Sequence, residues 1–379
     1  MSVRTARRLR GMERTLIRRI FDAAPPDAIN LGLGQPDLPT PAVASLAGIA
    51  GIVDGRTGYT PTAGETTLRD AIAASHGPFA SGPDNVLVTV GSQEAMFAAF
   101  LALLDEGDEL LYPDPGYPAY SGIARLLGAR PVSYPVRAER AFRVDPDDVI
   151  GRLTPKSRLV VLCSPSNPTG AVTPRTDLFS LIGELEQRGV AWLSDEIYAD
   201  FSYREAFVSA SACSGGNGGL VVSGLSKGFS MTGWRVGWVV GAAKIISRLT
   251  TVHQYLVTCA PSISQAAAMA AFSPRGRSER RRYGAILRRR REIMGEELRS
   301  LSGVRPVEPD GAFYYFVDVS RYGSSIELAR RLLDRRKVIT IPGEAFGENC
   351  AGWLRLSFAC SEDGIREGLS RIREELAGA

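Results

Sequence analysis

Lysine is scarce in this sequence. Of its 45 lysine and arginine residues only four are lysine, at positions 156, 227, 244 and 337. Wherever positive charge alone is needed, the chain therefore uses arginine. Lys227 follows a short apolar run, residues 220–222, and stands among small residues that would let a ligand approach. This setting favours amine chemistry, which arginine cannot perform because its guanidinium does not deprotonate. A solvated loop lysine is the alternative.

Cysteine is also sparse and has no pattern. The five cysteines are scattered and odd in number, and no two of them form a C-x-x-C pair. This predicts free thiols in a reducing compartment, with neither a disulfide framework nor a metal site. The arginine-rich N-terminus has no continuous apolar stretch, and no apolar run is long enough to span a membrane. We expect a cytoplasmic protein with no membrane partner; a transit peptide is the alternative for the N-terminus.

A strong excess of charge is missing as well. The formal net charge is +4, and local clusters of arginine include residues 4–19 and 275–291. Apolar residues within 16–21 predict that a helix of the first region docks on the rest of the protein. The second region lies in a long helical pattern, which favours a solvated helix face over a nucleic-acid site. No nucleic-acid partner is expected.

Alternating strand-like and helix-like runs fill the chain from residue 85 onward. This alternation predicts an α/β domain with a largely parallel sheet. Ser92, Asn167, Asp195 and Lys227 each follow a predicted strand. Because ligands bind at the carboxyl ends of strands in an open parallel sheet, we expect these side chains to meet in one crevice.

The run around Lys227 has a recognisable sequence. Residues 223–238 read SGLSKGFSMTGWRVGW, which resembles the lysine-attachment signature of the class I/II aminotransferases. These are fold-type-I enzymes that use pyridoxal 5'-phosphate, and the resemblance extends from about residue 31 to residue 355. In that family the lysine forms a Schiff base with the cofactor, and the arginine eight residues later binds the cofactor phosphate. The resemblance therefore implies these roles for Lys227 and Arg235.

The same resemblance implies a fold. It is an α/β fold, the fold-type-I transferase, with a large domain around a mostly parallel seven-stranded sheet and a small α+β domain. On this chain we expect an N-terminal arm and small-domain segment at residues 1–40. The large domain is expected at residues 41–270 and the small C-terminal domain at residues 271–379.

Three further residues are expected at the cofactor phosphate. We expect residues 91–94 to form a turn and residues 95–104 to form a helix. A Gly-Ser turn that opens a helix leaves backbone N–H groups free at the positive helix end, so Ser92 and Gln93 would join Arg235 there. Ser226 is the third. Without the resemblance, Ser92 is also explained as an ordinary helix N-cap.

Four residues are expected at the cofactor ring. Tyr117 follows a strand in a proline-rich loop and matches the family's stacking aromatic, although it could equally cover the edge of the sheet. Asn167, in the string SNPTG, and Tyr198 match residues that hydrogen-bond the phenolic oxygen. Asp195 ends an apolar strand, where a carboxylate needs a cationic partner such as a protonated pyridine nitrogen. A helix N-cap is the alternative for Asp195.

The family's substrate and interface positions fall on Gly34, Arg355 and Tyr59. Gly34 belongs to a segment over the substrate carboxylate, and Asn167 lies beside that site. Arg355 lies inside an apolar strand, where binding of the substrate carboxylate or a structural salt bridge would explain a buried guanidinium. Tyr59 matches a tyrosine that reaches the cofactor phosphate of the neighbouring subunit, which implies a homodimer; otherwise it is a turn aromatic.

The sequence thus predicts an aminotransferase that moves an amino group from an L-amino acid to a 2-oxo acid. A lyase, replacement or cyclising enzyme with the same cofactor site is the alternative. The chain departs from many relatives at Gly224, where they carry a serine for the phosphate; Ser223 or Ser226 could substitute. A hydrolase built on Ser226 is excluded, because no acid lies between Ser226 and His253, the only histidine after it. No segment identifies a second arginine that reads the substrate side chain.

Overall fold

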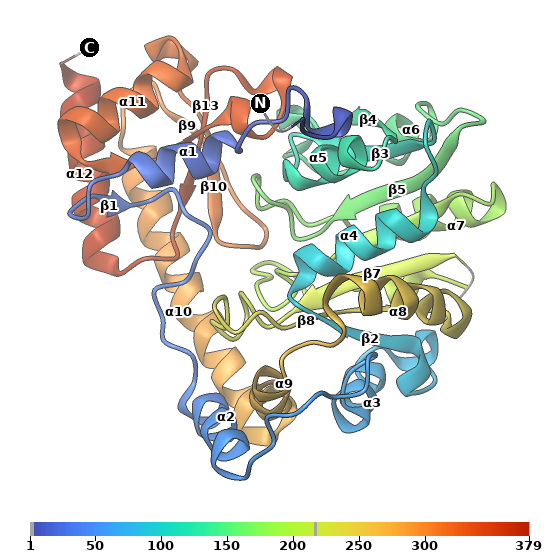
Figure 1. Cartoon of the computed structure of the whole chain (residues 1–379). Coiled ribbons are helices and arrows are strands. Elements are labelled where there is room, and N and C mark those ends of the chain that lie inside the picture. Colours follow the sequence, from blue (N-terminus) through green and yellow to red (C-terminus); the bar gives the residue numbers. More distant parts are fainter. Residues whose placement is uncertain (1–3, 216–217, 379) are drawn as a thin grey trace.

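The computed structural model describes residues 4–215 and 218–378 of the chain. Two lobes lie side by side, one built around a large sheet and one around a smaller sheet (Figure 1). The long helix α10 (Pro274–Arg299) starts near α2 (Ala42–Val53) and α9 (Ser262–Met269) and runs up into the smaller lobe. None of the helices in these two described segments is both long and apolar enough to cross a membrane.

The large sheet has seven strands in the order β2-β8-β7-β6-β5-β3-β4. They are β2 (Val86–Thr89), β3 (Glu109–Asp114), β4 (Arg130–Pro135), β5 (Ser157–Cys163), β6 (Ala191–Asp195), β7 (Gly219–Gly224) and β8 (Gly237–Gly241). Every pairing is parallel except those of β8, which runs antiparallel to both β2 and β7. The predicted mostly parallel seven-stranded sheet is confirmed.

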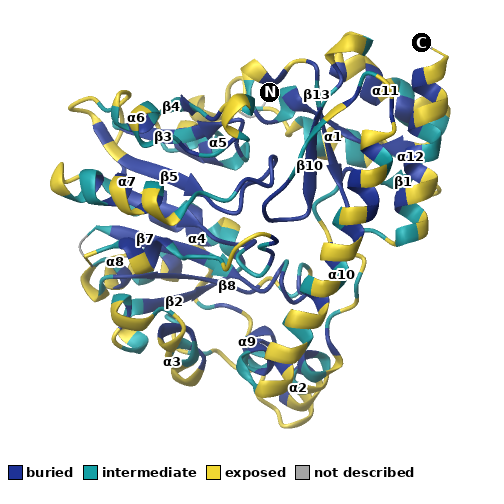
Figure 2. Cartoon of the chain, turned by 180° about the vertical axis from the view of Figure 1, so that it is seen from behind, coloured by how far each residue is buried: buried dark blue, intermediate teal, exposed yellow. Residues whose placement is uncertain are grey.

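Helices cover both faces of this sheet, which is why its strands are apolar on both sides. In β5, Leu159 and Val161 belong to one apolar cluster, whereas Val160 and Leu162 belong to another. Helices α4 (Ser92–Leu103), α5 (Ala119–Leu126) and α8 (Ala243–Val257) cover the first face (Figure 1). Helices α3 (Thr66–Ala74), α6 (Pro146–Ile150) and α7 (Arg175–Gln187) cover the second (Figure 2).

The smaller lobe joins the two ends of the chain. Its antiparallel sheet contains β9 (Arg305–Val307), β10 (Tyr314–Asp318), β12 (Ile341–Pro342) and β13 (Trp353–Ser357). A separate parallel pair joins β1 (Ile29–Asn30) to β11 (Val338–Ile339). Helices α1 (Leu16–Ala23), α11 (Ser325–Arg336) and α12 (Glu362–Ala377) complete the lobe. The domain limits at residues 40 and 270 stay predictions.

Short 3-10 helices fill several of the connections. They are η1 (Arg7–Leu9), η2 (Gly77–Phe79), η3 (Pro83–Asn85), η4 (Ala138–Arg140), η5 (Ala210–Cys213), η6 (Ala270–Phe272), η7 (Ser320–Tyr322), η8 (Gly343–Ala345) and η9 (Glu348–Cys350). All five cysteines are free thiols, as the sequence predicted.

Two local predictions need correction. Residues 92–94 form the first turn of α4 rather than a turn before it, because Gly91 has a φ of +79° and lets the strand pass directly into the helix. The arginines of α10 are only partly a solvated face. Arg290 is buried and forms an ion pair with Asp37, and Arg280 forms one with Asp200. Both aspartates lie in loops against which α10 packs, and a buried charge needs a partner of opposite charge.

Candidate active site

A cavity of about 1160 Å³ lies at the carboxyl ends of the parallel strands, where the two lobes meet. The four strand-end residues Ser92, Asn167, Asp195 and Lys227 all line it, so the predicted crevice is present in the structure. The remaining predicted site residues that line it are Gly34, Gln93, Tyr117, Tyr198, Ser226, Arg235 and Arg355. Of the predicted set, only Tyr59 lies elsewhere.

Lys227 stands in the loop that follows β7. Its Nζ donates a hydrogen bond of 2.6 Å to the carbonyl oxygen of Gly34. Burial, and then the positive charges of Arg355 and Arg235, lower the pKa of the Lys227 amine to about 8. A substantial fraction of this amine is therefore neutral near physiological pH, as a nucleophile or a proton acceptor must be.

Asp195 ends β6 with its carboxylate buried at the cavity. The hydroxyl of Tyr120 donates to Oδ2 at 2.8 Å, and the backbone N–H of Ile197 donates to Oδ1 at 3.2 Å. Burial raises the pKa of Asp195, and the hydrogen bonds from Tyr120 and Ile197 oppose that rise. Within the described chain no cationic side chain forms an ion pair with Asp195, so the carboxylate is free to hold a positively charged ligand atom.

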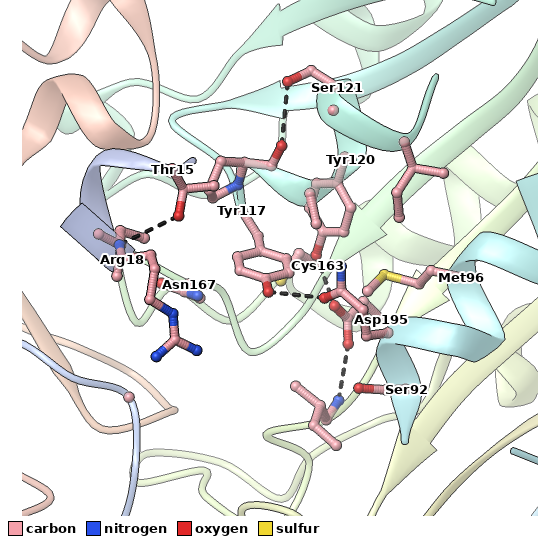
Figure 3. A pocket seen from close by; sticks show the side chains of 18 of the residues that line it. Thr15, Arg18, Ser92, Met96, Tyr117, Tyr120, Ser121, Cys163, Asn167 and Asp195 are labelled. Carbon is pink, nitrogen blue, oxygen red and sulfur yellow. Dashed lines mark hydrogen bonds between the residues drawn. The ribbon is translucent and has the colours of Figure 1, made fainter. Parts of the chain in front are cut away.

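Tyr117 lines the cavity from the connection between β3 and α5. Its hydroxyl donates to Oε1 of Gln93 at 2.9 Å, and its ring meets Tyr120 edge-on with centroids 5.7 Å apart. Figure 3 shows Tyr117, Tyr120 and Asp195 directed into the same space. The hydrogen bond to Gln93 fixes the ring orientation, which is the requirement for an aromatic that stacks on a planar ligand.

An anion cradle forms where α4 begins. Arg235 has a φ of +53° and donates from Nη1 to the Thr232 carbonyl and from Nη2 to the Val90 carbonyl, at 3.0 and 3.3 Å. No carboxylate among residues 4–215 and 218–378 pairs with it. A Cβ on Gly91 would lie 2.5 Å from Arg235 Nη2, and a Cβ on Gly237 would lie 2.5 Å from the Ser92 nitrogen. Glycine at both positions leaves the helix N-terminus open to a phosphate.

Arg355 and Asn167 form the second polar centre. Arg355, in β13, is 2% exposed, and its Nη1 donates to Asn167 Oδ1 at 2.7 Å. Its Nη2 donates to the Gly32 carbonyl, and its Nε has no protein partner. The guanidinium lies 4.4 Å from the centroid of the Tyr314 ring, and no described carboxylate pairs with it. The structural salt bridge considered for Arg355 is therefore not formed within the described chain, and its charge is available to a ligand carboxylate.

At two glycine positions, neighbouring atoms leave too little room for a Cβ atom. A Cβ on Gly34 would lie 2.0 Å from the Tyr314 hydroxyl, which itself hydrogen-bonds the Tyr198 hydroxyl at 2.7 Å. A Cβ on Gly224 would lie 2.9 Å from the Val236 carbonyl oxygen, so the serine of many relatives does not fit here without a shift. Ser223 does not substitute, because it lies outside the cavity and donates to the Glu196 carbonyl. Ser226 lines the cavity.

Sequence reasoning missed three features of the cavity. Tyr120 is three residues after Tyr117, in the first turn of α5, and a second aromatic beside a predicted stacking residue was a usable signal. Tyr314 stands at the start of β10, and only its place between Gly34, Tyr198 and Arg355 reveals its role. Several residues between positions 8 and 21, among them Arg8, Thr15 and Arg18, also line the cavity, and no sequence signal connected them to it.

Comparisons with known proteins identify the family. The family model described as "Aminotransferase class I and II" matches residues 26–372. An aspartate aminotransferase of Pyrococcus horikoshii is 34% identical over 98% of this chain and 97% of its own. The arginine–pyruvate transaminase AruH of Pseudomonas aeruginosa is 36% identical over 90% of this chain and 88% of its own.

Solved structures agree with these relatives. The aspartate aminotransferase of Thermus thermophilus with maleate superposes with a TM-score of 0.93 at 31% identity, over 98% of this chain and 100% of its own. Both the fold and the cofactor class predicted from residues 223–238 are thereby confirmed. The chain belongs to the class I and II aminotransferases, enzymes that depend on pyridoxal phosphate.

Proposed function

We propose that the cavity around Lys227 is the active site of an aminotransferase that moves an amino group between an L-amino acid and a 2-oxo acid. One observation carries this assignment. The Lys227 amine shares its cavity with a buried carboxylate, an open anion cradle and a guanidinium that pairs with no described carboxylate. The family's lyase and replacement chemistry would use the same residues, but the relatives named above are transaminases, which favours amino transfer.

The residues present fit pyridoxal phosphate. Arg235, Ser92, Gln93 and Ser226 would hold the phosphate at the N-terminus of α4, and the gap kept open by glycines 91 and 237 supports this placement. Tyr117 would stack on the ring. Asp195, buried and without a described cationic partner, would hold the protonated ring nitrogen. When bound, the cofactor supplies an aldehyde that captures amines and a ring that accepts electrons.

Lys227 would perform the proton transfer. With a pKa lowered to about 8, its amine would hold the cofactor and, when free, would accept a proton from the substrate Cα. The same Nζ would hold that proton and release it again later in the reaction, so that Lys227 would act first as a base and then as an acid. The Gly34 carbonyl accepts a hydrogen bond of 2.6 Å from Nζ and orients the amine in the cavity.

Arg355 and Asn167 would orient the substrate. The guanidinium binds the substrate α-carboxylate as a planar fork, and its Nη1 contact with Asn167 Oδ1 fixes the plane of that fork. Tyr198 and Asn167 would face the phenolic oxygen of the cofactor. The hydrogen bond between Tyr198 and Tyr314 holds the Tyr198 hydroxyl in position.

The proposed assembly is a cytoplasmic homodimer. Tyr59 is 90% exposed and outside the cavity of its own chain, which supports a role in the site of a second copy. Val53 and Tyr255 are also largely exposed, at 79% and 86%, more than expected for apolar side chains that face water. Five free cysteines support a reducing compartment.

The test compares the wild type with Lys227→Ala and with Lys244→Ala as the control, since Lys244 is exposed on α8 outside the cavity. Each protein is mixed with pyridoxal phosphate, and visible absorbance and release of 2-oxo acid from a panel of amino acids are measured. We expect Lys227→Ala to lose the absorbance of covalently held cofactor and the activity, while Lys244→Ala keeps both. Activity retained by Lys227→Ala would refute the proposal.

A further inference from the structure

A second cavity, of about 540 Å³, lies outside the active site, between α10 and the segment that follows β6. None of its lining residues belongs to the cavity around Lys227. Its volume is within the range of small-molecule sites, about 300–1,000 Å³. Four of the described residues that line it are arginines, and we call it the arginine groove; they are Arg277, Arg280, Arg281 and Arg288.

These arginines share one face of α10. Arg277, Arg281 and Arg288 follow the spacing of neighbours on a helix surface, with Gly284 at the step between the last two. A Cβ built on Gly284 would lie 3.7 Å from the nearest backbone atom of the segment after β6. Because a glycine stands between the arginines, a ligand has room among the guanidinium groups. The outward side of α10 is exposed over much of its length, so the groove can be reached from solvent (Figure 2).

Among the described residues that line the groove, Asp200 is the only acid, and it is already paired. Nε of Arg280 donates to both carboxylate oxygens of Asp200, at 2.9 and 3.1 Å, and Nη2 lies 2.7 Å from Oδ1. On its other side the carboxylate abuts Gly228, where a Cβ would lie 1.6 Å from Oδ2. Asp200 is therefore committed to Arg280 and does not neutralise the other arginines.

The other three guanidinium groups keep their positive charge. Arg277 donates to the carbonyl oxygen of Phe272, and Arg288 donates to that of Tyr203, and these acceptors carry no net charge. Across residues 4–215 and 218–378, no carboxylate lies within 4 Å of Arg277, Arg281 or Arg288. Two of the three guanidinium groups are thus held in place before a ligand arrives, which lowers the entropic cost of binding.

We propose that the arginine groove is a second ligand site and binds a small anion with two phosphate groups, a diphosphate. A guanidinium presents a planar fork that matches phosphate oxygens. Along the helix axis Arg281 lies about 6 Å from Arg277 and about 10 Å from Arg288, which favours a ligand with two charged centres over a single phosphate. The aromatic residue of the groove, Tyr203, is 7% exposed and offers no face for base stacking, which disfavours single-stranded nucleic acid.

The test measures binding of inorganic diphosphate to the holoenzyme by calorimetry at low ionic strength, where charges are least screened. The holoenzyme is used so that the cofactor occupies the phosphate cradle at α4. Arg281→Met is compared with Arg282→Met, which removes the same charge one position along the helix. Arg281 is exposed and has no carboxylate partner among the described residues, so its replacement should leave the fold intact. Arg282 pairs with Glu279 and does not line the groove.

We expect Arg281→Met to weaken diphosphate binding at least about tenfold, the loss of one charge-assisted contact. Arg282→Met should change it by no more than about twofold. Inorganic phosphate and succinate, a dicarboxylate, are measured on the wild type and should each bind at least about tenfold more weakly than diphosphate.

Three outcomes would overturn the inference. Diphosphate could bind Arg281→Met as tightly as the wild type, or succinate could bind the wild type as tightly as diphosphate. The third is a single-stranded RNA oligomer that binds the wild type more tightly than diphosphate and is weakened by Arg281→Met. Because binding is measured without turnover, each result is independent of the activity proposed for Lys227.

Discussion

The hydrogen bond from Tyr120 to Asp195 stabilises the ionised form of the Asp195 carboxylate in the cavity. Burial holds the pKa of Asp195 above that of an aspartate in an unfolded chain, and the Tyr120 hydroxyl opposes this effect. The protonated form is thus favoured in the fold as pH falls. A protonated Asp195 is neutral and no longer holds a positively charged ring nitrogen.

Tyr120→Phe should therefore shift the acid limit of cofactor retention to higher pH. Loss of one hydrogen bond to a charged group costs about 1.5–3 kcal/mol, which corresponds to a shift of about one to two pKa units. Retained pyridoxal phosphate is measured after dialysis in a series of buffers of decreasing pH, since Asp195, with its pKa raised by burial, loses its charge as the pH falls. Tyr134→Phe is the control, because Tyr134 is equally buried and donates to the Val161 carbonyl at 2.8 Å. An identical acid limit in both variants would show that Tyr120 does not act through Asp195.

Sequence alone placed eleven of the twelve predicted site residues on one cavity, because family motifs lie at strand ends and a parallel sheet brings those ends together. It did not find Tyr120 or Tyr314, whose importance depends on which carboxylate or hydroxyl each one meets. Contacts between distant segments have no local pattern. A sequence signature can identify Asp195, but only the three-dimensional structure shows which residue contacts it.

At the scale of elements, the start of α4 depends on the close approach of β8. A Cβ on Gly237 would lie 2.5 Å from the Ser92 nitrogen and 2.6 Å from the Gly91 carbonyl carbon, and these are backbone atoms that cannot rotate away. Gly237→Ala should push the N-terminus of α4 out of place and lower the affinity for pyridoxal phosphate at least about tenfold, because the helix end holds the phosphate.

The affinity is measured by titration of the apoprotein, with Gly233→Ala as the matched control. Gly233 lies in the connection between β7 and β8, four residues before Gly237, and nothing lies within 4 Å of a Cβ built on it. We expect the control to bind the cofactor as the wild type does. Equal affinity in Gly237→Ala and the wild type would mean that the α4 terminus does not contribute to binding.

The fold itself followed largely from the sequence, for a physical reason. Strands buried on both faces, such as β5 and β7, read as continuous apolar runs between polar turns. The residues at which helices begin, and the partners of their charged side chains, were harder to predict from the sequence. The first turn of α4 begins at Ser92 because of the positive φ of Gly91, and the arginines of α10 were assigned to solvent because their acidic partners lie far away in sequence.

At the scale of the whole molecule, the exposed position of Tyr59 bears on assembly. A single chain leaves this tyrosine outside the cavity, although the family places it at a cofactor phosphate. In a two-fold dimer the same surface patch serves both subunits, so each copy could supply its Tyr59 to the other. The exposed apolar side chains of α2, among them Ile49 and Ile52, would then be covered by the partner.

Mixing two defective variants tests this exchange directly. A Tyr59→Ala subunit would lack the tyrosine that contributes to the site of the partner subunit. A Lys227→Ala subunit would lack the lysine of its own site. After unfolding and refolding together, a hybrid dimer would contain one site with a native Lys227 and a native Tyr59, and random pairing should restore about a quarter of wild-type activity.

The activity is measured at limiting cofactor, where loss of a phosphate contact has its largest effect. Lys227→Ala mixed with Arg235→Ala is the control and should stay inactive, since both residues line the cavity of one chain. Recovery in neither mixture would exclude an exchange of Tyr59 between subunits.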